Sequence, residues 1–252
     1  MKKIVQKELN KFIESNIQEF HQRRLESLLK LRLEDILKRK NPYLFKAKNI
    51  NTAQDLVKNL LDAHLSSQEE GIFGGFLERL AIYVSEKVFG GRKSSAEGID
   101  LEIEAREAKY IVSIKSGPNW GNNSQIQRMI DNFNKVKKIL GKGLPIIAVN
   151  GCCYGCDDNP DKGAYFKYCG QRFWQFISDD EDLYIEIIEP LGFKAKERNE
   201  EFWKEYAKII NKFTMEFGKK FCDSDGAILW SRIVQLNSGK KKKASYEKRM
   251  DE

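Results

Sequence analysis

The stretch GIDLEIEAREAKYIVSIK, residues 98–115, decides the fold. From Ile99 onward its side chains alternate between apolar and acidic. The apolar positions are Ile99, Leu101 and Ile103, and the acidic positions are Asp100, Glu102 and Glu104. A period of two residues is typical of a β-strand with one buried face. With a turn over 106–109 and a second strand over 110–115, rich in aromatic and β-branched residues, the stretch predicts a β-hairpin.

The register of this hairpin brings charged groups together. A turn over 106–109 would pair Glu102 with Ser113 and Asp100 with Lys115, all on one face of the sheet. Two carboxylates beside an ammonium form a site for a hard divalent cation, because Mg²⁺ prefers oxygen ligands and keeps several waters, one of which can attack a phosphodiester. The lysine would orient or help to deprotonate that water and neutralise charge on the phosphate. The alternative is a surface hairpin with alternating salt bridges, each of little energetic weight.

Helical patterns and a buried strand surround the hairpin. An apolar stripe over 73–88 predicts a helix before it, which ends at two glycines. After the loop GPNWGNNS, residues 117–124, a second helix is expected with apolar side chains inward over 126–136. The run LPIIAVN, residues 144–150, is typical of a central strand, and the intervening helix allows a parallel crossover. This order predicts an α/β fold with a mixed central β-sheet flanked by helices.

The segments farther from the hairpin are mostly helical by their periodicity. Two amphipathic helices are expected over 4–40, forming an N-terminal helical extension. A short helix is expected to start at Thr52, and a separate one at Ser66 and Ser67. Downstream we expect a helix over 170–178, a strand over 183–188 and a long helix over 201–217.

Basic side chains gather at the two ends of the chain. Residues 1–48 hold 13 basic and 6 acidic side chains and residues 239–252 hold 6 and 3, whereas the segment between them holds 25 and 28. This distribution suits termini that touch a polyanion, although solvated surface lysines give the same counts. We expect a basic helical arm over 1–48, one α/β domain over 49–238 and a disordered lysine-rich tail over 239–252.

The cysteine count and the lack of long apolar runs favour the cytoplasm. Five cysteines is an odd number, and neither an N-terminal apolar segment nor a run of eighteen apolar residues occurs, so secretion and membrane insertion are not expected. The group Cys152, Cys153, Cys156 and Cys169 contains one CxxC spacing, which is compatible with zinc. Because no second close pair follows, buried free thiols are favoured over a zinc site.

Several strings in the sequence resemble those of a known group of proteins. They are NPYLFKAKNI (41–50), EGIDLE (97–102), IKSGPNWGN (114–122), GCCYG (151–155) and CGQRFWQFIS (169–178). They resemble type II restriction endonucleases of the PD-(D/E)XK nuclease superfamily, and the resemblance extends over about residues 40–235. It implies a restriction-endonuclease-like core and Mg²⁺-dependent hydrolysis of DNA.

The resemblance also implies roles for individual residues. Asp100 matches the first metal-binding aspartate of the superfamily, and Lys115 matches its catalytic lysine. Ser113 stands where most members carry Asp or Glu, two residues before the lysine. One metal-binding carboxylate is therefore missing from its usual position, and Ser113 is expected to hold a water or a phosphate oxygen.

Three other acids could supply the missing carboxylate. The first acid after Lys115 is Asp131, sixteen residues on, whereas Glu102 would face Ser113 directly in the expected register. We therefore favour Glu102 over Asp131 as catalytic group and metal ligand. Glu78, on the edge of the preceding helix's apolar stripe, is a further candidate ligand, since members of the superfamily often place a glutamate there. An ordinary solvated glutamate is its alternative interpretation.

Polar side chains that follow Lys115 suit contacts with nucleic acid. Asn and Gln can form paired hydrogen bonds with adenine and Arg with guanine, and a helix N-terminus can accept a phosphate. The candidate DNA-binding residues are Asn119, Trp120, Asn122, Asn123, Gln125 and Arg128, with Arg172 from the later CGQRFW segment. A loop this rich in Gly and Asn could also be a simple turn.

Pattern and resemblance together predict a sequence-specific, Mg²⁺-dependent endonuclease that cuts double-stranded DNA. A homodimer is expected, because one site per chain must cut two antiparallel strands. No membrane and no small-molecule cofactor are expected. The rival interpretations are a non-specific repair or mobile-element nuclease on the same fold, and a non-catalytic DNA-binding module in which Ser113 marks a degenerate site.

Overall fold

The computed structural model describes residues 4–140 and 143–239. Apart from Gly239, the expected lysine-rich tail lies outside these residues. The chain forms two compact units, residues 1–24 with 69–199 (unit 1) and residues 25–68 with 200–252 (unit 2). Three long helices contribute to both units: α1 (Gln6–Leu29), α4 (Ala53–Phe89) and α9 (Ala195–Phe221).

Unit 1 contains one five-stranded sheet in the order β1-β2-β3-β4-β5. The strands are β1 (Arg92–Lys93), β2 (Leu101–Ala105), β3 (Ala108–Lys115), β4 (Ile146–Cys152) and β5 (Phe166–Cys169). The first three strands pair antiparallel, and β3, β4 and β5 pair parallel. The expected mixed sheet is therefore confirmed, and so is the parallel crossover between β3 and β4.

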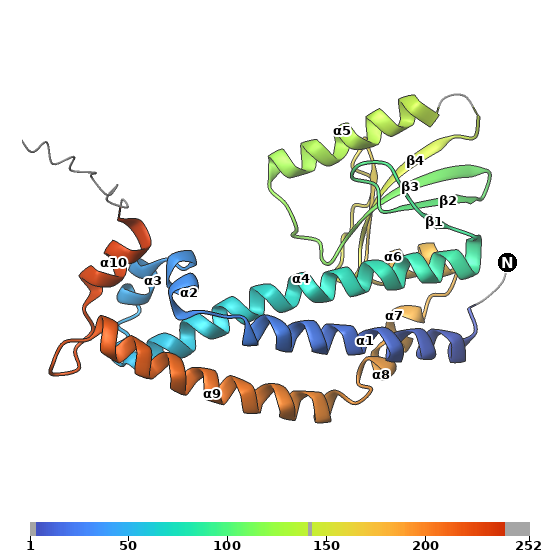
Figure 1. The fold of residues 1–252 in the computed structure, drawn as a ribbon. Coiled ribbons are helices and arrows are strands. Elements are labelled where there is room, and N and C mark those ends of the chain that lie inside the picture. The colour runs from blue at the N-terminus through green and yellow to red at the C-terminus, as the bar shows by residue number, and fades with distance from the viewer. Residues whose placement is uncertain (1–3, 141–142, 240–252) are drawn as a thin grey trace, which may run out of the picture. The chain divides into compact units, whose positions relative to one another are not determined.

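Helices cover both faces of this sheet (Figure 1). On one face α5 (Asn123–Leu140) packs Met129, Phe133 and Val136 against Ile111 and Ala148. On the other, α4 and the first part of α1 share an apolar cluster with α6 (Gln171–Ser178). The buried side chains of α4 in that cluster are Phe76, Leu77, Leu80, Ala81, Val84 and Val88. The stripe seen in the sequence is thus the face by which α4 packs on the sheet.

The hairpin forms, but its register differs from the expected one. Ala105 pairs with Ala108, Leu101 pairs with Val112, and Glu102 pairs with Ile111 rather than with Ser113. Only two residues make the turn, because Arg106 and Glu107 both adopt a left-handed backbone, with φ of 54° and 58°. This geometry matches the twist of paired strands, and it is usually built from Asn and Gly. The pairings of Glu102 with Ser113 and of Asp100 with Lys115 were therefore wrong.

The predicted break between two helices at Ser66 and Ser67 is also wrong. The segment 53–89 is one helix of 37 residues rather than two. Thr52 is its cap as expected, since its Oγ1 accepts a hydrogen bond from the Asp55 amide at 3.1 Å. Ser67 starts no new helix, because its hydroxyl donates to the Ala63 carbonyl one turn earlier.

The expected strand over 183–188 is instead a pair of helical turns, α7 (Leu183–Glu186) and α8 (Ile188–Leu191). Leu183 and Ile187 are four residues apart and buried together, while Ile185 and Ile188 are exposed. Spacing by four is that of a helix face, and it prevails here over the alternation that suggested a strand. Two short strands, β1 and β5, were not anticipated.

The regular elements described in unit 2 are helices, with one isolated antiparallel bridge between Cys222 and Ile228. Its apolar cluster joins α2 (Leu33–Arg39) and α10 (Trp230–Ser238) to its segments of α4 and α9. The short helix α3 (Pro42–Ala47) begins at Asn41, whose side chain accepts from the amides of Tyr43 and Leu44. In the described part of the chain, no helix is long and apolar enough to cross a membrane.

Candidate active site

Asp100 lies at the start of β2, beside the end of β3. Its backbone amide donates to the Val112 carbonyl at 2.8 Å. Its carboxylate Oδ2 accepts from the Ile114 amide at 2.6 Å and lies 3.5 Å from the Ser113 hydroxyl. Asp100 therefore faces Ser113 and reaches the last residues of β3 after all. The observed register is shifted by two residues from the expected one, and a shift of two leaves every side chain on the same face of the sheet.

Lys115 ends β3 on that same face. Its Nζ lies 5.2 Å from the centroid of the Trp120 ring, within the range of a cation–π contact. Among the described residues it has no ion pair within 4 Å. The ammonium thus contacts an aromatic ring and, among the described residues, is not paired with a carboxylate. A lysine in this state can pair with a phosphate group.

Glu78 approaches the same place from α4. Gly74, one turn earlier on that helix, packs against Ser116, the residue after Lys115. Burial and then the negative charge of Asp100 raise the pKa of Glu78, and the charges of Lys93, Lys115 and Arg79 offset this only in part. The Lys93 ammonium is 3.9 Å from Oε1. The structure therefore brings together a half-buried glutamate, an aspartate and a lysine from three elements.

A cavity of about 360 Å³ opens beside Lys115. Its lining residues are Gly98, Ser113, Lys115, Trp120, Gln125, Arg128, Met129 and Asn132. Gly98 adopts a positive φ of 75°, and a Cβ there would meet the Asn132 amide nitrogen at 2.1 Å, so glycine allows α5 to approach the strand that carries Asp100. The cavity thus places five of the residues picked from the sequence around one space.

Glu102 is on the same face but within β2, where it pairs with Arg92 of β1 and Ile111 of β3. It accepts from Ser94 at 2.8 Å and from Arg92 at 3.0 Å, and it is paired with Lys109 at 3.3 Å. Burial alone would raise its pKa, but these three donors hold the pKa of Glu102 below its ordinary value. The argument that placed it opposite Ser113 is overturned by the register. Asp131 is exposed on α5 and accepts from Gln127.

The candidate DNA-binding residues separate into two places. Asn122 and Gln125 cap α5 reciprocally, each side chain accepting from the backbone amide of the other. Arg128 is exposed and paired with Glu97 at 3.1 Å, and Asn119 and Asn123 are exposed nearby in the chain. Arg172 lines a different cavity, with Arg106 and several aromatic rings.

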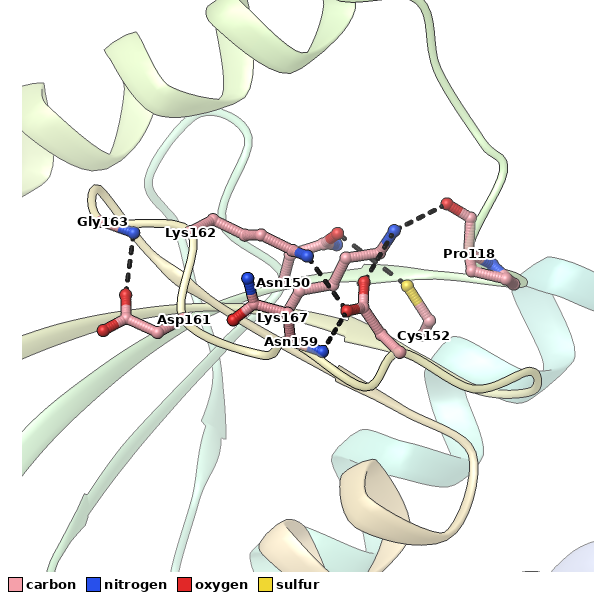
Figure 2. Close-up of polar contacts among 9 residues, drawn as sticks. Pro118, Asn150, Cys152, Asn159, Asp161, Lys162, Gly163 and Lys167 are labelled. Atoms are coloured by element: carbon pink, nitrogen blue, oxygen red, sulfur yellow. Dashed lines mark hydrogen bonds and ion pairs between the residues drawn. The ribbon is translucent and has the colours of Figure 1, made fainter.

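Three side chains that sequence reasoning did not single out hold the loop after Lys115. Asn150, buried completely in β4, accepts from the Trp120 indole at 3.0 Å. Lys167 of β5 donates to the Pro118 carbonyl at 3.0 Å, as Figure 2 shows, and it lies 3.5 Å from Asp157. A polar residue at the end of the apolar run LPIIAVN was the one signal that could have identified Asn150.

The cysteines do not gather into a metal site in the described part of the chain. Cys152, Cys153 and Cys169 are buried and Cys156 is exposed, all as free thiols. Burial raises the pKa of Cys153 to about 12, with a further contribution from the charge of Glu78. Within the described residues, no three His, Cys, Asp or Glu side chains come close enough to form a metal cluster.

A divalent cation that needs only two carboxylates fits Asp100 and Glu78. Within the described residues, the contacts of Asp100 use Oδ2 and the ion pair of Glu78 uses Oε1. One oxygen of each carboxylate is therefore available. Mg²⁺ is commonly held by one or two carboxylates, waters and substrate phosphate, so this donor set suits it.

A comparison with known protein families gives one match that spans this site. The family described as Type II restriction endonuclease EcoO109I matches residues 7–199, which is more than half of the chain. The match includes Glu78, Asp100, Lys115 and the loop that follows. No curated protein sequence matches the chain significantly.

Proposed function

The chain belongs to the family of the type II restriction endonuclease EcoO109I, and from this premise we propose that it hydrolyses phosphodiester bonds at a specific sequence in double-stranded DNA. The observation that carries the proposal is that the charges of Asp100 and Lys115 both act on Glu78, while Lys115 lines a cavity. A glutamate of raised pKa beside an unpaired cation is typical of catalytic sites.

Mg²⁺ is the proposed cofactor, held by Asp100 and Glu78. When bound there it would supply a water of lowered pKa and stabilise negative charge on the phosphate. Asp100 is oriented for this role by the Ile114 amide and the Ser113 hydroxyl, which fix its carboxylate at the strand end. Glu78 takes the part of the carboxylate that the usual spacing would put at position 113.

Lys115 is the proposed catalytic lysine. Its ammonium is positioned to orient the attacking water and to neutralise charge that develops on the phosphate. Ser113 is buried beside it, with its hydroxyl directed at Asp100, so it serves to orient that acid. Glu102 is satisfied by Arg92, Ser94 and Lys109, so its proposed role is to hold β1 and β3 to β2.

Double-stranded DNA is the proposed substrate, bound by a homodimer. A single site per chain cuts one strand, so two copies related by a two-fold axis match a palindromic sequence. Gln125 and Arg128 line the cavity beside Lys115, and Asn119 and Asn123 are exposed close to it in the chain. These four are the proposed contacts to bases and phosphates.

Incubation of the purified protein with a long DNA of known sequence tests the proposal. Discrete fragments that require Mg²⁺ and disappear with a chelator are the expected result. A smear would instead identify a non-specific nuclease, and retarded but uncut DNA would identify a binding module. The variant Asp100→Ala should bind DNA without cutting it, and retained cutting by this variant would contradict the site assignment.

A further inference from the structure

Asn150 is a fully buried amide at the centre of the parallel strands. It belongs to β4, where it pairs with Ser113 of β3. A buried amide is costly unless its donors and acceptor are satisfied. Its Nδ2 donates to the Ser113 carbonyl at 3.1 Å, and its Oδ1 accepts from the Trp120 indole at 3.0 Å. Because an indole nitrogen can only donate, this orientation of the amide is the one that satisfies both groups.

The Trp120 ring that Asn150 holds is the ring that contacts Lys115. The hydrogen bond that the Trp120 indole N–H donates to Oδ1 of Asn150 fixes the nitrogen edge of the ring. The Lys115 Nζ lies 5.2 Å from the centroid of that ring. A lysine side chain has four rotatable carbons and no preferred direction of its own. Since Lys115 has no ion pair among the described residues, the ring is the contact that limits where its ammonium can lie.

The loop that carries Trp120 is tied down a second time. Lys167 reaches from β5 to the Pro118 carbonyl and is itself paired with Asp157, in the group of contacts drawn in Figure 2. Burial would raise the pKa of Asp157, but Lys162, the Asn159 amide and Lys167 hold it below its ordinary value. The backbone of the loop is therefore anchored independently of the indole, and the bond to Asn150 acts on the ring itself.

We propose that Asn150 is a positioning residue for Lys115, acting through the Trp120 indole. The inference rests on the proposed nuclease function, in which the Lys115 ammonium must meet the attacking water and the phosphate. Without the bond to Asn150 the ring turns away, and the ammonium loses the surface that confines it. A displacement of about 1 Å at a catalytic group is enough to slow a reaction by about a hundredfold.

Trp120→Phe separates this role from simple packing, because it keeps an aromatic ring and removes the N–H. We expect the single-turnover cleavage rate at saturating DNA to fall about 10- to 100-fold, with DNA affinity changed by no more than about threefold. The same exchange at an exposed indole, Trp203→Phe, is the matched control and should leave the rate unchanged.

A double-mutant cycle then asks whether the effect passes through the lysine. In a Lys115→Ala background, Trp120→Phe should cause no further loss, and Asn150→Leu should likewise add nothing. Equal losses in the presence and absence of the lysine would overturn the proposal, since they would mean that Asn150 and Trp120 act on something else.

A measurement that needs no cleavage distinguishes failure of this inference from failure of the nuclease assignment. The ε-methylene protons of Lys115 should be shielded by the Trp120 ring in NMR spectra of lysine-labelled protein, with Lys115→Met identifying the signal. Asn150→Leu should remove the shielding, or Asn150→Ser if the leucine variant does not fold. Shielding that persists without the amide would contradict the proposal even if the protein cuts DNA as expected.

Discussion

Glu102 and Glu78 are two carboxylates of the same unit in opposite surroundings. Glu102 meets a serine hydroxyl and two cations, and together they lower its pKa. Glu78 meets one cation at 3.9 Å, and its burial and then the negative charge of Asp100 raise its pKa. A metal ion adds little electrostatic stabilisation to a carboxylate whose charge is already balanced by cations. It adds much more to a carboxylate that lies beside another acid. This contrast supports our proposal of a structural role for the first glutamate and a metal-binding role for the second.

The comparison also shows why closeness in sequence misleads. Glu102 is two residues from Asp100, while Glu78 is on another element, yet Glu78 is the acid whose charge interacts with Asp100. Because a strand extends by about 3.3 Å per residue, successive side chains on one face lie well apart from each other. A helix that packs on the sheet can bring a side chain from elsewhere in the chain close to the strand. Spacing along the strand therefore predicted the acid that interacts with Asp100 less well than helix packing does.

The largest expected effect is at Asp100, the acid whose negative charge helps to raise the pKa of Glu78. Asp100→Asn keeps the shape of the side chain but removes its charge, and we expect cleavage to fall about a thousandfold or more, since several kcal/mol of electrostatic stabilisation are lost. Glu104→Gln is the matched control, because Glu104 is exposed on the same strand. Rates measured in single turnover that agree within about tenfold would contradict the assignment.

A smaller effect, of opposite sign for the two glutamates, is expected in the pH dependence of stability. Glu78 has a raised pKa when folded, so it favours folding below the ordinary glutamate pKa and loses this contribution as the pH rises through the raised value. Glu102 has a lowered pKa, so it stabilises above the ordinary value and loses this contribution as the pH falls through the lowered one.

Urea unfolding of Glu78→Gln and Glu102→Gln at pH 4 and pH 7 measures both contributions. Relative to the unchanged protein, Glu78→Gln should be more stable at pH 7 than at pH 4. Glu102→Gln should be less stable at pH 7 than at pH 4, by no more than about 1 kcal/mol, because pH 4 lies less than one pH unit below the ordinary glutamate pKa. If the stability difference between pH 4 and pH 7 changed in the same direction in both variants, the opposite pKa shifts of Glu78 and Glu102 would be contradicted.

The smallest expected effect concerns the turn that sets the register. Glu107 has a φ of 58°, which a side chain disfavours and glycine does not. Glu107→Gly should therefore raise the free energy of unfolding by up to about 1 kcal/mol. Glu104→Gly, in the adjacent strand, should lower it instead. A loss of stability in the turn variant would mean that the two-residue turn is wrong.

Much of the sheet could be predicted from alternation and helical spacing. Asp100 and Lys115 were placed on one face, and this survived the wrong register because the error was an even number of residues. The turn itself could not be found, since Arg106 and Glu107 lack the Asn and Gly that usually mark it. Leu183 and Ile187 fit periods of two and of four equally, and only packing distinguished the two.

The candidate site was harder to predict than the fold. Lys115 was predicted from its position and from the resemblance, but the contact of its ammonium is with Trp120, five residues later. Asn150 lay inside a run that reads as apolar, and its partners become visible only when β4 pairs with β3. Lys115, Trp120 and Asn150 are joined by tertiary contacts, and local sequence patterns do not predict such contacts.

Single-turnover cleavage by Glu78→Gln and Glu102→Gln, side by side on the same DNA with Mg²⁺, tests the central claim most directly. The two changes are chemically identical, so any difference reports position alone. We expect Glu78→Gln to lose cleavage about a hundredfold or more, as for removal of a charge at the reacting centre, and Glu102→Gln to cut at a rate within a few-fold of the unchanged protein. Cleavage kept by Glu78→Gln and abolished in Glu102→Gln would contradict the account.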